Sequence, residues 1–190
     1  MTVMTYTDFE EGPKHLEHKR LQPEEFDALR GDITTYVETG TFWGYQLKFA
    51  SEAFDRVIGI EIDPSCVQRS REWCADCDNV TVMEGDSTTV LPELVKEIDV
   101  PVWFYLDSHY CDNPFQPLTP GPFPLWVELR AILARKQPDI IFIDDVHTWG
   151  KPYEGQPEWQ YVSKGTLLAF LEPRVMKHEI RKDGMVVWLS

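Results

Sequence analysis

The chain has 190 residues, of which 32 are acidic and 18 basic, with a formal net charge of −14 and an apolar fraction of 43%. These values are typical of a single globular domain that buries its own core. Because so negative a chain is repelled by phosphate backbones and acidic membrane surfaces, we expect no nucleic acid and no membrane as a partner.

The targeting and cysteine signals indicate a cytoplasmic protein. No run of about 18 apolar residues is present, and residues 1–20 lack the apolar core of a signal peptide. Four cysteines are too few for a disulfide scaffold, so we expect reduced thiols. Cys74 and Cys77 form a Cys-x-x-Cys pair within a helical pattern. Without a second such pair, buried structural thiols are favoured over a zinc site.

The predicted elements begin after a polar N-terminal extension, residues 1–31, in which the spacing of apolar residues from Leu16 to Leu29 predicts one short helix. Strands are predicted at 33–38, 56–61, 79–83, 102–106, 139–143, 176–181 and 185–189. Helices are predicted at 45–54, 64–76, 88–98, 125–136 and 164–171. We expect Asp63 and Ser87 to cap the second and third of these helices, and Asp183-Gly184 to form a hairpin turn.

This alternation predicts an α/β fold, with a Rossmann-like seven-stranded sheet that is mostly parallel, helices on both faces, and a C-terminal antiparallel β-hairpin. Residues 32–190 would form one domain. Ligands of such sheets bind at the carboxyl ends of the strands, near the point where the strand order reverses. The long connections 108–124 and 146–163 leave that edge, and we expect them to form the walls of an acceptor pocket.

Acidic residues follow the predicted strands at this ligand edge. They are Glu38, Glu61, Asp63, Asp86, Asp107, Asp144 and Asp145. After Glu38, the segment Gly40-Thr41-Phe42-Trp43-Gly44 forms a short turn that opens a helix. Such a turn directs backbone N–H groups and a helix N-terminus at a carboxylate or phosphate, so it predicts a small-ligand site.

These features resemble class I S-adenosylmethionine-dependent methyltransferases over about residues 32–190. The first turn of that family reads acid-x-Gly-x-Gly-x-Gly; Glu38, Gly40 and Gly44 match it, and Phe42 stands at the middle glycine. The resemblance implies S-adenosylmethionine as cofactor, bound by the turn with Thr41. It also implies that Glu61 binds the ribose hydroxyls, while Asp86 and Ser87 contact adenine. Asp63 is the rival to Glu61, but its place before Pro64 suits helix capping better.

Asp107, Asp144 and Asp145, with His109 and His147, form a second group at the ends of the fourth and fifth strands. Crowded carboxylates require a cation, and oxygen ligands favour Mg²⁺, although two histidines also suit iron or manganese. The group is similar to that of metal-dependent sugar O-methyltransferases. This likeness implies that the three aspartates hold Mg²⁺, and that His147 or His109 acts as the base beside Asp107. The alternative is that one aspartate caps a turn and one histidine makes a structural hydrogen bond.

Segments 106–110 and 124–129 also resemble uncharacterised bacterial proteins of the same fold. Together, these signals predict a methyltransferase that carries out metal-assisted O-methylation of a small hydroxylated molecule, such as a sugar or secondary metabolite. A small-molecule acceptor and a homodimer are the expected partners. Two alternatives remain: a metal-dependent hydroxylase or hydrolase that uses the Asp/His group, and a non-catalytic nucleoside-binding module, which the missing glycine at Phe42 would favour.

Overall fold

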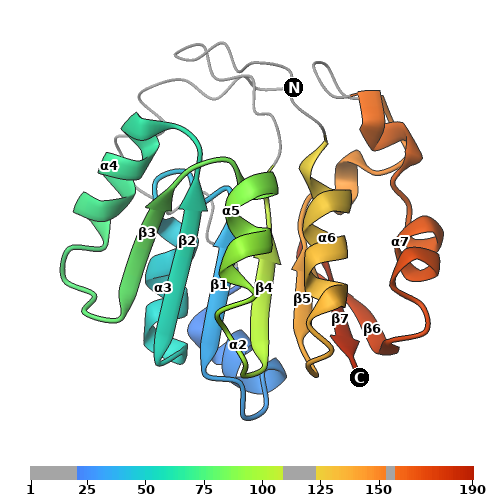
Figure 1. Ribbon diagram of the computed structural model, residues 1–190, viewed down its shortest axis with the longest axis horizontal. Helices are drawn as coiled ribbons and strands as arrows, with labels where there is room; N and C mark the ends of the chain where they lie inside the picture. Colours follow the sequence, from blue (N-terminus) through green and yellow to red (C-terminus); the bar gives the residue numbers. More distant parts are fainter. Residues whose placement is uncertain (1–20, 109–122, 153–156) are drawn as a thin grey trace.

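A computed structural model describes residues 21–108, 123–152 and 157–190 of the chain. Its centre is a seven-stranded sheet in the order β3-β2-β1-β4-β5-β7-β6 (Figure 1). The strands are β1 (Thr35–Thr39), β2 (Arg56–Glu61), β3 (Val80–Glu84), β4 (Val102–Leu106), β5 (Ile140–Ile143), β6 (Val175–Arg181) and β7 (Gly184–Leu189). Strands β1 to β5 are parallel, and β7 is antiparallel to both β5 and β6. The predicted fold class is confirmed.

Helices cover both faces of the sheet (Figure 1). They are α2 (Pro23–Leu29), α3 (Tyr45–Ala53), α4 (Pro64–Trp73), α5 (Ser87–Leu94), α6 (Pro124–Ala134) and α7 (Lys164–Leu171), with 3-10 turns η2 (Val146–Thr148) and η3 (Pro157–Tyr161). Alternate strand residues face opposite ways, so Val37 and Phe104 pack with α5, α6 and α7, while Tyr36 and Trp103 pack with α2, α3 and α4. None of the described helices is long and apolar enough to cross a membrane.

Two helix caps and the final hairpin test the local predictions. Asp63 caps α4, as predicted, because its Oδ1 accepts the N–H groups of Ser65 at 2.7 Å and Cys66 at 3.4 Å. The predicted cap of α5 is wrong by one residue. Asp86 is the cap and accepts the Thr88 N–H at 2.8 Å, whereas Ser87 is the first helical residue.

The hairpin between β6 and β7 is confirmed, but its turn is Lys182-Asp183 rather than Asp183-Gly184. Gly184 is already the first residue of β7, where a side chain would collide with the ring of Phe142. The lack of a side chain at Gly184 therefore allows β7 to pack closely against β5. Lys182 occupies the left-handed position of the turn, with φ 52°.

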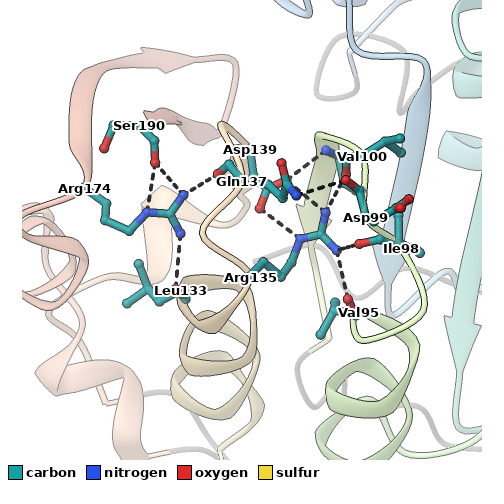
Figure 2. Close-up of polar contacts among 11 residues, drawn as sticks. Val95, Ile98, Asp99, Val100, Leu133, Arg135, Gln137, Asp139, Arg174 and Ser190 are labelled. Atoms are coloured by element: carbon teal, nitrogen blue, oxygen red, sulfur yellow. Dashed lines mark hydrogen bonds and ion pairs between the residues drawn. The ribbon is translucent and has the colours of Figure 1, made fainter.

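A buried arginine network holds the opposite, amino-terminal edge of the sheet (Figure 2). The Arg135 side chain at the end of α6 is 2% exposed and forms an ion pair at 3.0 Å with fully buried Asp139. It also donates to the carbonyl oxygens of Val95 at 3.0 Å, Ile98 at 2.7 Å and Val100 at 2.6 Å. Because Asp139 accepts the N–H of Val102 as well, one guanidinium ties α6 to the segment that precedes β4.

Candidate functional site

The turn between β1 and α3 is shaped by two glycines in the left-handed conformation. Gly40 has φ 75°, and a side chain there would overlap the Asp107 carbonyl group, so this glycine lets the ends of β1 and β4 approach closely. Gly44 has φ 79° and precedes α3, where a Cβ would lie 2.5 Å from the Ser70 hydroxyl oxygen. Glu38, at the end of β1, is fully buried and accepts the Tyr36 hydroxyl at 3.1 Å.

Phe42 keeps the backbone conformation expected of the glycine that it replaces. Its φ is 50°, in the left-handed region that a non-glycine residue adopts at a cost of roughly 1–2 kcal/mol. Its N–H donates to Glu61 Oε2 at 2.7 Å, and its ring stacks on Trp43 with centroids 5.0 Å apart. Thr41 is 3% exposed and lies against Gly59 of β2. The turn therefore tolerates Phe42. The Thr41 backbone is bonded within the protein, since its N–H donates to the Ile60 carbonyl oxygen at 3.4 Å and its own carbonyl oxygen accepts the Gly44 N–H at 2.8 Å.

Glu61 lies at the end of β2 with its carboxylate held by two backbone donors. Phe42 N–H bonds to Oε2 at 2.7 Å and Asp63 N–H to Oε1 at 2.9 Å. The residue is 8% exposed, and burial raises the pKa of its carboxyl group, while the N–H groups of Asp63 and Phe42 oppose that rise. Each carboxylate oxygen has a second lone pair, so the group keeps acceptor capacity for two further donors.

Asp86 and Ser87 lie at the start of α5, after β3. Asp86 Oδ1 accepts both the N–H and the hydroxyl of Thr88, at 2.8 and 2.7 Å. Ser87 is 6% exposed, and its hydroxyl donates to the Ser108 hydroxyl at 3.1 Å. Asp86 thus acts first as a helix cap, and Ser87 connects the end of β3 to the end of β4.

The ends of β4 and β5 bring Asp107, Asp144 and Asp145 within electrostatic range, as the sequence predicted for neighbouring strands. Burial, followed by the charges of Asp107 and then Asp145, raises the pKa of the Asp144 carboxyl group well above its usual value. Asp144 accepts the Tyr105 hydroxyl at 2.7 Å and the Asp145 N–H at 2.8 Å. A negative charge on Asp144 is therefore opposed by its two neighbours.

His147 lies in η2 and pairs with Asp183, a residue that the sequence suggested only as part of a turn. Its Nδ1 is 2.5 Å from Asp183 Oδ2 and 3.7 Å from Asp145 Oδ1, and its side chain is 55% exposed. Within residues 21–108, 123–152 and 157–190, Asp145, His147 and Asp183 are the group whose ligand atoms all lie within 4.8 Å of one another. His109, the other predicted base, lies outside the described residues.

Glu128 is a site residue that the sequence interpretation missed. It lies on the buried side of α6 between Leu125 and Ile132, and it is 1% exposed. The Ser108 hydroxyl donates to its Oε1, and the hydroxyls of Ser87 and Thr39 lie near enough to the carboxylate to lower its pKa. Burial raises the pKa of Glu128 to about 6, against the lowering effect of these three hydroxyls. The sequence signal that could have identified Glu128 was a charged residue among the apolar residues of one helix face.

The free energy of unfolding should depend on pH through Glu128. Between its ordinary pKa of 4.5 and about 6, the folded protein binds this proton more tightly than the unfolded chain. The contribution of Glu128 therefore falls as pH rises through that window, by about 2 kcal/mol, and is constant above it. Denaturant unfolding of the wild type and of Glu128→Gln at several pH values measures this contribution, because the other titrating groups cancel in the difference. A pH-independent difference would contradict it.

A small pocket, with room for about one water molecule, lies at the carboxyl ends of β4 and β5. It is lined by Leu106, Asp107, Ser108, Phe123, Leu125, Glu128, Ile143, Asp144 and Trp159. Phe123 and Trp159 come from the ends of the two long connections, and their rings meet edge to face at 5.0 Å. The described parts of both connections thus contribute a wall to this pocket, and its polar residues all offer acceptor oxygens.

No protein-family model matches the sequence, and no curated protein matches it significantly. Solved structures do match. A SAM-dependent methyltransferase from Aquifex aeolicus has a TM-score of 0.59 and 17% identity, with 98% of each chain covered. The SAH-bound methyltransferase PaMTH1 of Podospora anserina has a TM-score of 0.62 and 20% identity, over 86% of this chain and 74% of that one.

An O-methyltransferase from Bacillus cereus in complex with SAH has a TM-score of 0.58 and 19% identity, over 83% of this chain and 74% of that one. Because these sequence identities are only 17–20%, the similarity shows a shared fold and nothing more. The chain has the fold of the S-adenosylmethionine-dependent methyltransferases, which confirms the fold that the sequence resemblance implied.

Proposed function

We propose that this protein transfers a methyl group from S-adenosylmethionine to a hydroxyl group of a small molecule. The observation that carries the proposal is the Glu61 carboxylate, fixed at the end of β2 by the N–H groups of Phe42 and Asp63. In a sheet of this order, β1 and β4 flank the point where the strand order reverses, and small ligands bind there. The net charge of −14 favours a small acceptor over nucleic acid.

Three of the predicted cofactor features, Glu61, Asp86 and the Gly40–Gly44 turn, would each contact a different part of the cofactor. The second lone pairs of the Glu61 oxygens would accept the two ribose hydroxyls. Both hydrogen bonds to the Asp86 side chain go to Oδ1, so Oδ2 would accept the adenine amino group. The N-terminus of α3, which follows the left-handed turn from Gly40 to Gly44, would face the methionine carboxylate. The bound cofactor supplies an electrophilic methyl group on a cationic sulfur.

The carboxylate chemistry of Asp107, Asp144 and Asp145 suits a divalent metal, although Asp145 with His147 and Asp183 is the group of described residues whose ligand atoms all lie within 4.8 Å of one another. Their oxygens are the ligands that Mg²⁺ prefers, and a cation would relieve the repulsion that Asp107 and Asp145 exert on Asp144. We propose Asp107, Asp144 and Asp145 as the ligands; the alternative set is Asp145 with His147 and Asp183. A bound metal would lower the pKa of an acceptor hydroxyl. His147, which lies 2.5 Å from the Asp183 carboxylate, would then accept the proton.

Asp145 belongs to both ligand sets, so Asp145→Asn should weaken binding of Mg²⁺ or Mn²⁺ by at least about tenfold. Calorimetric titration of the metal alone measures this. Asp107→Asn should weaken binding comparably if the aspartate set is right, and Asp183→Asn if the histidine set is right. Asp55→Asn, at an exposed position after α3, is the control. Unchanged metal affinity in Asp145→Asn would exclude both sets.

The activity itself is tested by incubating the protein with methyl-labelled S-adenosylmethionine and a panel of sugars, phenols and catechols, with Mg²⁺ or with a chelator. The proposal predicts label in at least one hydroxylated compound, and less label after chelation. Binding of the cofactor without transfer to any acceptor would instead favour the nucleoside-binding module. Label on nitrogen would contradict O-methylation while leaving the cofactor site intact.

A further inference from the structure

Glu128 is a charged residue at a position where packing alone would select an apolar one. Its neighbours on the buried side of α6 are Leu125, Leu129 and Ile132, at the spacing of one helix face. Glu128 is 1% exposed, and burial of a carboxylate is costly unless its oxygens are well bonded. The residue therefore calls for an explanation through the groups that it binds.

Three hydroxyls from three separate segments lie near the carboxylate. Thr39 is the last residue of β1, Ser87 the first of α5, and Ser108 lies two residues after β4. Ser87 donates to Ser108 at 3.1 Å, and Ser108 donates to Glu128. The buried carboxylate thus holds Ser108 through a hydrogen bond to a charged acceptor, which is stronger than a neutral one, and through Ser108 it reaches Ser87.

Each of the three hydroxyl residues adjoins a residue of the proposed site. Thr39 stands between Glu38 and Gly40, Ser87 follows Asp86, and Ser108 follows Asp107. We propose that Glu128 is a positioning residue, which holds Ser108 and, through it, Ser87 beside the end of β1, and so sets the spacing of the segments that bind the cofactor. This inference rests on the proposed function, because it takes the cofactor to bind along these segments.

The experiment compares calorimetric affinities for S-adenosylhomocysteine, at pH 8, of the wild type, Glu128→Gln, Ser87→Ala and the double variant. Glutamine keeps the size of the side chain but replaces one acceptor oxygen by a donor group that cannot accept from a hydroxyl. We expect Glu128→Gln to raise Kd about tenfold. We also expect the double variant to lose less than the sum of the single losses, since Glu128 acts through Ser87.

Ile132→Val is the matched control, because it perturbs the same buried face of α6 without touching the three hydroxyls. It should lower the melting temperature and leave Kd unchanged. If Glu128→Gln does not fold, Ser108→Ala removes the hydroxyl that joins Glu128 to Ser87 and should raise Kd about threefold.

Three outcomes would overturn the inference. Affinity of Glu128→Gln within about twofold of the wild type would make Glu128 a structural residue only. Additive losses in the double variant would show that Glu128 and Ser87 act independently. Failure of the wild type to bind S-adenosylhomocysteine would remove the proposed function as well, which distinguishes it from the first two results.

Discussion

Glu61→Ala is expected to weaken binding of S-adenosylhomocysteine about a hundredfold, because it removes acceptors for both ribose hydroxyls and releases the Phe42 N–H. The carboxylate is 8% exposed, so the lost contacts are poorly replaced by water. Without the bond to Oε2, the left-handed conformation of Phe42 also loses its support. The measurement is calorimetric titration of the cofactor product at neutral pH.

Glu84→Ala is the matched control for this variant. Glu84 ends β3 in register with Glu61 at the end of β2, but it is exposed. Its removal should leave the affinity unchanged, since its position lies one strand further from the turn. If the affinity of Glu61→Ala for S-adenosylhomocysteine is within about threefold of that of the wild type, Glu61 is not the ribose ligand. The proposed cofactor site would then be contradicted at the residue on which it most depends.

Arg135→Met is expected to lower the free energy of unfolding by about 3–5 kcal/mol, because it leaves the Asp139 charge buried without its partner. The carbonyl oxygens of Val95, Ile98 and Val100 lose their donors at the same time (Figure 2). For a protein of this size the loss corresponds to a fall in melting temperature of roughly 10 °C. Denaturant titration with calorimetric melting measures both quantities.

Two comparisons make the Arg135 result interpretable. Lys96→Met breaks an ion pair whose side chains are 65% and 71% exposed, and should change stability by less than about 0.5 kcal/mol. The double variant Arg135→Met/Asp139→Asn should recover part of the loss, because the unpaired charge is gone. A loss below about 1 kcal/mol in Arg135→Met would show that water reaches Asp139 and that the network contributes little.

Local patterns in the sequence predicted much of the fold and the edge of the sheet at which acidic residues gather. Short apolar runs ending in acids marked the strands, and parallel strands bring their carboxyl ends to one edge, so the placement of Glu61, Asp86 and Asp107 at that edge followed from chain order alone. The cap at Asp63 was predicted correctly for the same reason: capping depends on neighbours within three residues.

Glu128 and Asp183 were missed because their roles depend on residues far away in sequence. Glu128 accepts a hydrogen bond from Ser108 and lies near hydroxyls of β1 and α5, and Asp183 contacts His147 across 36 residues. Gly184 was assigned to a turn, although it lies in β7, where the absence of a side chain leaves room for the ring of Phe142 in β5. Phe42, in place of the middle glycine of the family motif, argued against a cofactor-binding turn, yet its backbone adopts the glycine-like conformation. At these four positions the residue type alone did not predict which distant groups the residue contacts.

The most direct test of the central claim is calorimetric titration of the wild-type protein with S-adenosylmethionine and S-adenosylhomocysteine. A cofactor site built on the Gly40–Gly44 turn, Glu61 and Asp86 predicts that both bind one to one, with Kd below about 100 μM. It also predicts that adenosine binds more weakly, because it lacks the carboxylate that the N-terminus of α3 would bind. Absence of binding by either compound at high micromolar concentration would contradict the account.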